Sequence, residues 1–243
     1  MTRTILRGLW AVVVAGGCLA TSSAQADLVS VNLTNTDGPR QILAGETTGV
    51  LPDSAWHNLQ LGGPTGTAAD VGGSVIDVAW TASSVGRQNT ARDASNPDGT
   101  DGFLALFEAG LLDSAPGTPS SVTLSDLSAY LSATGLPSYN VYAYFKSPIT
   151  ASPDGISING VTVDPDATAI SVNDSFVLAG NPESNYAVFT GLTADTFSIT
   201  FDRVDRDALL VGFQVAAVPE ASQVLMLGLI TAGIGVTRWR RRR

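Results

Sequence analysis

The chain has 243 residues, of which 22 are acidic and 13 are lysine or arginine, giving a formal net charge of −9. It contains one histidine, His57, and one cysteine, Cys18, which excludes zinc sites rich in these residues. Residues 27–217 hold 21 acids against six cations, a formal charge of −15. Such a surface repels phosphates, so we exclude nucleic acid as a partner.

The first 26 residues have the pattern of a signal peptide. Arg3 and Arg7 precede an apolar stretch, and the small residues Ala24 and Ala26 fit the cleavage site of signal peptidase. We predict cleavage after Ala26, so that the mature chain is exported and contains no cysteine. A faint lipoprotein-box pattern ending at Cys18 leaves lipidation as an alternative.

Alternating and β-branched segments predict strands through the rest of the chain, with turn residues between them. These segments are residues 29–33, 75–80, 139–145, 197–201 and 209–215. About 190 residues suit one all-β domain with a single core. We therefore predict an all-β fold, a single antiparallel β-sandwich whose first and last strands lie near each other.

Local signals add one hairpin and two short helices. Asn159-Gly160 between apolar residues predicts a hairpin over residues 156–163 with a type I′ turn, because both residue types tolerate positive φ. Residues 103–109 are expected to form two helical turns. Residues 124–131 are expected to begin a second helix with Ser125 as its cap.

The last 26 residues have the pattern of a membrane anchor. Val218, Pro219 and Glu220 lead into an uncharged run, residues 221–237. Seventeen helical residues span about 25 Å, close to the hydrocarbon core of a bilayer. The run is closed by a cluster of basic residues: Arg238, Arg240, Arg241, Arg242 and Arg243. By the positive-inside rule, these arginines keep the C-terminus in the cytoplasm and leave the body outside.

This arrangement resembles the PEP-CTERM sorting tail of Gram-negative bacteria, which the membrane enzyme exosortase recognises and cleaves. The resemblance implies sorting through Val218, Pro219 and Glu220, with Ala221 standing where the family has a second proline. The alternative is an ordinary single-span anchor that is never processed.

The body resembles a recurrent PEP-CTERM ectodomain with a galactose-binding-like jelly roll. The resemblance rests on the opening strand, the segments 49–52 and 54–59, the strands 139–145 and 186–189, the Asn159-Gly160 hairpin and the closing residues 211–215. It implies a sandwich of jelly-roll type, a fold that hosts binding and structural modules alike.

An acidic segment is a candidate calcium site. Asp93, Asn96, Asp98 and Asp101, with Glu108 nearby, bring hard oxygen donors together among glycines. The segment does not match the EF-hand spacing. The alternative is a solvated turn, and calcium is the one cofactor the sequence suggests.

Aromatic residues suggest a glycan platform. Strand alternation puts Tyr142 and Tyr144 on one face of residues 139–145, where the two rings could stack on sugars, with Trp56 or Trp80 adding to them. The alternative is that both faces of this strand are covered and that Trp80 belongs to the core.

We therefore expect three parts: a signal peptide (1–26), a β-sandwich ectodomain (27–217) and a sorting tail (218–243). The expected function is that of a non-enzymatic protein, anchored briefly in the inner membrane, then released by exosortase to the cell surface or extracellular polysaccharide. The alternative is a lectin-like carbohydrate-binding module. A secreted hydrolase is the third hypothesis. The sequence has no Gly-x-Ser-x-Gly motif whose serine His57 could activate, and no pair of catalytic carboxylates can be singled out.

Overall fold

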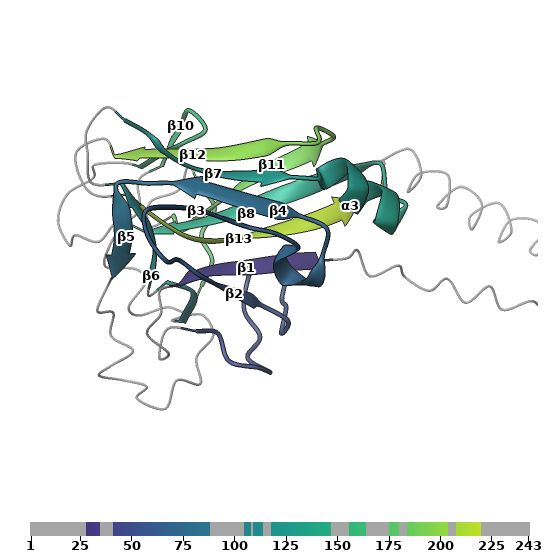
Figure 1. The fold of residues 1–243 in the computed structure, drawn as a ribbon, viewed down its shortest axis with the longest axis horizontal. Coiled ribbons are helices and arrows are strands. Elements are labelled where there is room, and N and C mark those ends of the chain that lie inside the picture. Colours follow the sequence, from purple (N-terminus) through teal and green to yellow (C-terminus); the bar gives the residue numbers. More distant parts are fainter. Residues whose placement is uncertain are drawn as a thin grey trace, which may run out of the picture.

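The computed structural model describes residues 28–34, 41–87, 105–107, 109–113, 118–146, 156–163, 175–179, 184–203 and 208–219. These residues form two β-sheets with little helix (Figure 1). The all-β, two-sheet prediction is confirmed. The signal peptide and the span at residues 221–237 lie outside the described residues.

The larger sheet has seven strands, with β11, β8, β13, β1 and β2 in that order and with β6 and β5 continuing from β13. Its strands are β1 (Leu28–Thr34), β2 (His57–Gln60), β5 (Ser84–Arg87), β6 (Ala109–Asp113), β8 (Ser138–Lys146), β11 (Tyr186–Leu192) and β13 (Ala208–Val218). The smaller sheet has six strands, ordered β10-β9-β12-β7-β4-β3. They are β3 (Thr65–Ala68), β4 (Asp77–Thr81), β7 (Ser120–Ser125), β9 (Ile156–Ile158), β10 (Val161–Val163) and β12 (Phe197–Arg203).

Strand β13 is the centre of the larger sheet. It pairs with β8 along one edge and with β6 and then β1 along the other, so all of its residues before Val218 are buried. The first and last strands pair antiparallel, with Leu28 opposite Ala216, which confirms their predicted proximity. The purely antiparallel prediction is wrong at β2, which runs parallel to β1 because the long connection between them allows a crossover.

The inner core lies between the two sheets. Alternate residues of β8 face it, namely Tyr139, Val141, Ala143 and Phe145, and all four are fully buried. Trp80 of β4 also belongs to this core, where its indole N–H donates to the Gly63 carbonyl at 3.1 Å. The predicted division of β8 into two faces is therefore confirmed.

The hairpin prediction is confirmed. Strands β9 and β10 pair antiparallel across a two-residue turn, with φ of 48° at Asn159 and 78° at Gly160. Two positive φ angles define a type I′ turn.

The helix predictions were less accurate. Within residues 103–109, Ala105 and Leu106 are helical, but Ala109 already belongs to β6. Helix α3 (Leu127–Thr134) begins two residues after the predicted cap, because Ser125 ends β7 and pairs with Asp77. Its first turn is capped from elsewhere in the chain: the Leu127 and Ser128 amides donate to the carbonyl and carboxylate of Asp195 at 3.1 and 2.9 Å.

Candidate functional site

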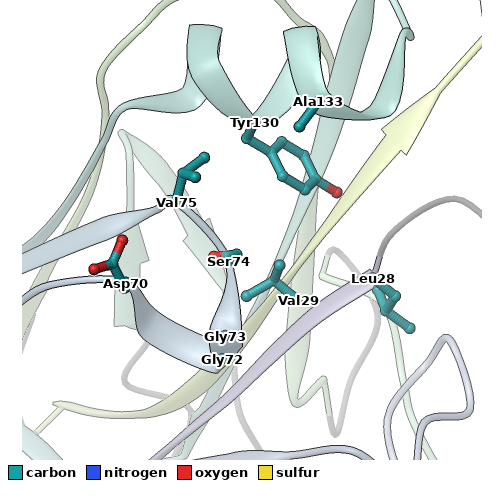
Figure 2. Close-up of a pocket in the computed structure, with 9 residues that line it drawn as sticks. All are labelled: Leu28, Val29, Asp70, Gly72, Gly73, Ser74, Val75, Tyr130 and Ala133. Carbon is teal, nitrogen blue, oxygen red and sulfur yellow. The ribbon is translucent and has the colours of Figure 1, made fainter.

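A pocket of about 560 Å³ lies at the end of the sandwich where β1 begins, between α3 and the 3-10 turn η2 (Val71–Gly73) (Figure 2). Its lining residues are Leu28, Val29, Asp70, Gly72, Gly73, Ser74, Val75, Tyr130 and Ala133. The volume is within the range of small-molecule sites. Apolar side chains from three elements, together with the backbone of η2, form most of its wall.

The η2 wall is a compact turn. Asp70 and Gly72 have φ of 49° and 70°, which turns the chain sharply before β4. The Ser74 hydroxyl donates to the Val71 carbonyl at 2.6 Å and accepts from the Ile76 amide at 3.1 Å. Because Val71 and Ile76 are buried in the inner core, the turn is fixed to the sandwich.

The opposite wall is held by Tyr130 of α3. Its hydroxyl donates to the Val215 carbonyl at 3.3 Å and accepts from the Ala217 amide at 2.9 Å. These bonds join the helix to the last residues of β13. The pocket therefore lies beside both ends of the described body.

The lining of the pocket is mostly apolar and carries few titratable groups. Its lining supplies one carboxylate, Asp70, which is exposed, and no histidine. His57 lies nearby, since a Cβ added to Gly72 would be 3.9 Å from the His57 Cβ. Burial lowers the pKa of His57, so this side chain is neutral at pH 7. The pocket can take an apolar group with a hydrogen-bonding end.

The predicted glycan platform is wrong for two of its three residues. Tyr144 is fully buried and Trp56 is 8 % exposed, so neither ring is free to stack on a sugar. Tyr142 is half-buried and packs against the apolar residues that surround Tyr144 and Trp56. Strand alternation predicted correctly which residues share a face, but that face is covered.

The cover is residues 41–56, which we call the strap. Its Val50 amide donates to the Tyr144 hydroxyl at 2.8 Å, and the Trp56 indole N–H donates to the Thr48 carbonyl at 3.2 Å. Around Tyr144 lies an outer cluster of apolar residues: Ile42, Trp56, Ala105, Leu106, Phe107, Leu209 and Val211. This cluster packs on the outer face of the larger sheet.

Gln214 of β13 fastens the strap to the sheet. Its amide nitrogen donates to the Ser30 hydroxyl at 2.9 Å and to the Leu51 carbonyl at 2.8 Å. Its amide oxygen accepts from the Leu51 amide at 3.3 Å and from the Tyr144 hydroxyl. Gly49 is required here, because a Cβ would stand 2.6 Å from the Gln214 side chain and its φ is 97°.

The other predicted site residues lie mostly beyond the described residues. Val218 is the last residue of β13, opposite Ser138, and Pro219 follows it with its side chain exposed. The remaining predicted site residues lie outside the described part of the chain: Ala24, Ala26, Asp93, Asn96, Asp98, Asp101, Glu108, Glu220, Arg238 and Arg240 to Arg243. Across the part that is described, no helix has the length and apolarity to cross a membrane, and no three His, Cys, Asp or Glu residues cluster as metal ligands.

Sequence reasoning missed the pocket and the strap. The dipeptide Gly72-Gly73 is of a type common in turns, but nothing in the sequence places Tyr130 opposite it. Comparison with protein-family models, with curated proteins and with solved structures finds no match to this chain.

Proposed function

We propose that the protein is an exported, non-enzymatic surface or extracellular-matrix protein. Residues 218–243 hold it in the inner membrane until exosortase cleaves the tail near Glu220. The released body then associates with extracellular polysaccharide.

The observation that carries this proposal is the position at which the last described strand, β13, ends. The last backbone pair of β13 joins Val218 to Ser138, and Pro219 follows immediately. A cut at Glu220 removes no described strand, no described core residue and no described hydrogen bond. The proposed recognition motif thus begins at the last residue of β13, which supports a removable tail.

The two ends of the body support the same arrangement. Leu28 pairs with Ala216, so the start of β1 and the end of β13 lie at one end of the sandwich (Figure 1). With a signal peptide removed after Ala26 and a tail starting at Val218, this end faces the membrane before processing. The pocket beside α3 and η2 faces it too.

The alternatives have less support. The lectin-like module loses Trp56 and Tyr144 as stacking residues, because both rings are buried in the outer cluster. A hydrolase needs a nucleophile with a base, or two carboxylates, around one cavity. Apart from the Tyr130 phenol, Asp70 is the one titratable side chain that lines the described pocket.

The test uses residues 218–243 fused to a periplasmic reporter, in a bacterium that has an exosortase and in one that lacks it. We expect surface display in the first host and retention in the inner membrane of the second. Replacing the five terminal arginines by glutamate should abolish both, because the positive-inside bias is reversed. Equal surface display in the two hosts would show that exosortase is not required.

A further inference from the structure

The outer face of the smaller sheet carries an ordered set of hydroxyl groups. Inward positions of its strands are apolar, such as Val78, Trp80, Val122 and Ile199, which belong to the inner core. The outward positions of β3, β4, β7 and β12 are mostly serine and threonine. They are Thr65, Thr67, Thr81, Ser198 and Thr200, which are exposed, and Ser121, Thr123 and Ser125, which are partly exposed. We call this set the hydroxyl face.

Strand register aligns these residues in rows across four strands (Figure 1). One row runs through Thr65, Thr81, Ser121 and Thr200. The next runs through Thr67, Ala79, Thr123 and Ser198. Neighbouring strands lie about 4.8 Å apart, so the rows present hydroxyls at a regular spacing.

The array is held in place before any partner arrives. Threonine has a restricted χ1, and side chains on a sheet stand perpendicular to it. The Thr123 and Ser198 hydroxyls are 2.9 Å apart, and the Thr200 hydroxyl donates to the Asn159 side-chain oxygen at 2.9 Å. Ordering these groups on binding therefore costs little entropy.

The rows of the hydroxyl face are uncharged although the chain is acidic, with a formal charge of −9. Among the outward positions of these four described strands, the charged residues are Asp77 at the start of β4 and Asp202 near the end of β12, and none is a cation. A cationic partner finds little to attract it here, and an anionic partner finds no cation. The charge pattern fits an uncharged partner.

We infer that the hydroxyl face binds a neutral polysaccharide, which names the partner in the function proposed above and rests on that function. Each hydroxyl both donates and accepts, as sugar hydroxyls do. Each bond gains little against water, so binding depends on many contacts along one polymer. A protein partner fits less well, because protein interfaces are enriched in aromatic residues and arginine and depleted in serine.

The experiment uses the full-length protein in lauryldimethylamine oxide, a detergent without a sugar headgroup. Protein is sedimented with two insoluble neutral glucans, curdlan and cellulose, and with calcium alginate beads as the acidic polymer. The test variant combines Thr65→Val, Thr67→Val and Thr81→Val, which remove hydroxyls at nearly constant shape. The matched control combines Thr47→Val, Thr190→Val and Thr193→Val, three exposed positions away from the hydroxyl face.

We expect wild type and control to sediment with at least one neutral glucan and to sediment less with alginate. The test variant should lose about threefold or more of its retention, since several weak contacts are removed together. Should that variant fail to fold, Thr67→Arg alone must lower retention, because it places a bulky charge on an exposed strand position.

Two results would overturn the inference. One is equal retention of the test and control variants, or no retention of wild type by either glucan. The other is dimerisation through the hydroxyl face, seen by sedimentation velocity and lost in the test variant, without glucan binding. Neither result bears on sorting, which is read from the location of the reporter.

Discussion

The two apolar clusters of this protein lie on opposite faces of one sheet and are built differently. The inner core consists of side chains from both sheets, packed with few polar groups among them. The outer cluster is aromatic and is closed by the strap, which polar side chains fasten to the sheet. We therefore expect the stability of the inner core to depend mainly on close packing. The stability of the outer cluster should depend also on the hydrogen bonds that hold the strap.

Neighbouring residues of β13 allow this difference to be measured. Phe213 faces the inner core and Gln214 faces the strap, and both are fully buried. The same strand thus carries one residue that stabilises by packing and one that stabilises by bonding. Substitutions at the two positions separate the two contributions.

The largest effect is expected for Phe213→Ala. Truncating a fully buried phenylalanine removes apolar burial and leaves a cavity, which costs about 3–5 kcal/mol. Urea denaturation followed by tryptophan fluorescence measures the free energy of unfolding. A loss below about 1 kcal/mol would mean that the two sheets do not enclose a close-packed core.

Gln214→Leu should come next, at about 2–3 kcal/mol, although leucine keeps most of the volume. The reason is that the Leu51 amide and carbonyl lose their partner in a buried site. Gln60→Leu is the control, because Gln60 is an exposed glutamine on β2. If both glutamine variants are equally stable, the strap is not held by Gln214.

Tyr144 should make the protein sensitive to alkali. Burial raises the pKa of Tyr144 above its usual value, and burial with the nearby Asp195 charge raises the pKa of Tyr139 to about 12. A tyrosine whose pKa is raised by folding contributes stability. That contribution is fully present below the unfolded pKa of about 10 and is lost as the pH rises through the folded pKa. We expect the free energy of unfolding to fall from about pH 10 to about pH 12, between the unfolded and the folded pKa of Tyr139.

Tyr144→Phe separates this effect from general alkaline damage. The variant should be less stable than wild type by about 1–2 kcal/mol at pH 7, because the Val50 amide loses its acceptor. It should also lose less stability on going to high pH. An unchanged pH slope would exclude Tyr144 as a cause of the alkaline sensitivity.

The smallest effect is expected outside both clusters, at the β9–β10 hairpin. Gly160 has φ of 78° with open space around it, so Gly160→Val adds backbone strain and no clash. The cost should be about 1–2 kcal/mol. Gly160→Asn is the control, since asparagine tolerates this conformation. Equal thermal melting of the two variants would argue against the type I′ turn.

The inner core could be predicted from the sequence, whereas the outer cluster and the strap could not. Alternation in residues 139–145 and 197–201 predicted β8 and β12 with the correct inward faces. The same alternation placed Tyr142 and Tyr144 together but carried no information about their cover. The strap has no periodicity, and Leu51 meets Gln214 across 163 residues of chain.

Local signals predicted parts of the fold but not the candidate pocket. Asn159-Gly160 sets its own turn, so the hairpin followed from two residues. Helix α3 did not follow, because its first amides are capped by Asp195, far along the chain. The pocket requires that same helix to lie beside η2, and such tertiary placement leaves no short-range pattern.

The central proposal is that the sorting motif begins at the end of β13, so that the tail can be removed without loss to the described body. Intact-mass spectrometry of protein recovered from the surface of an exosortase-containing host tests this most directly. The account predicts a mature chain that starts at Asp27 and ends near Glu220, with the same thermal melting as the detergent-solubilised precursor. Surface protein that uniformly retains Arg243 would contradict it.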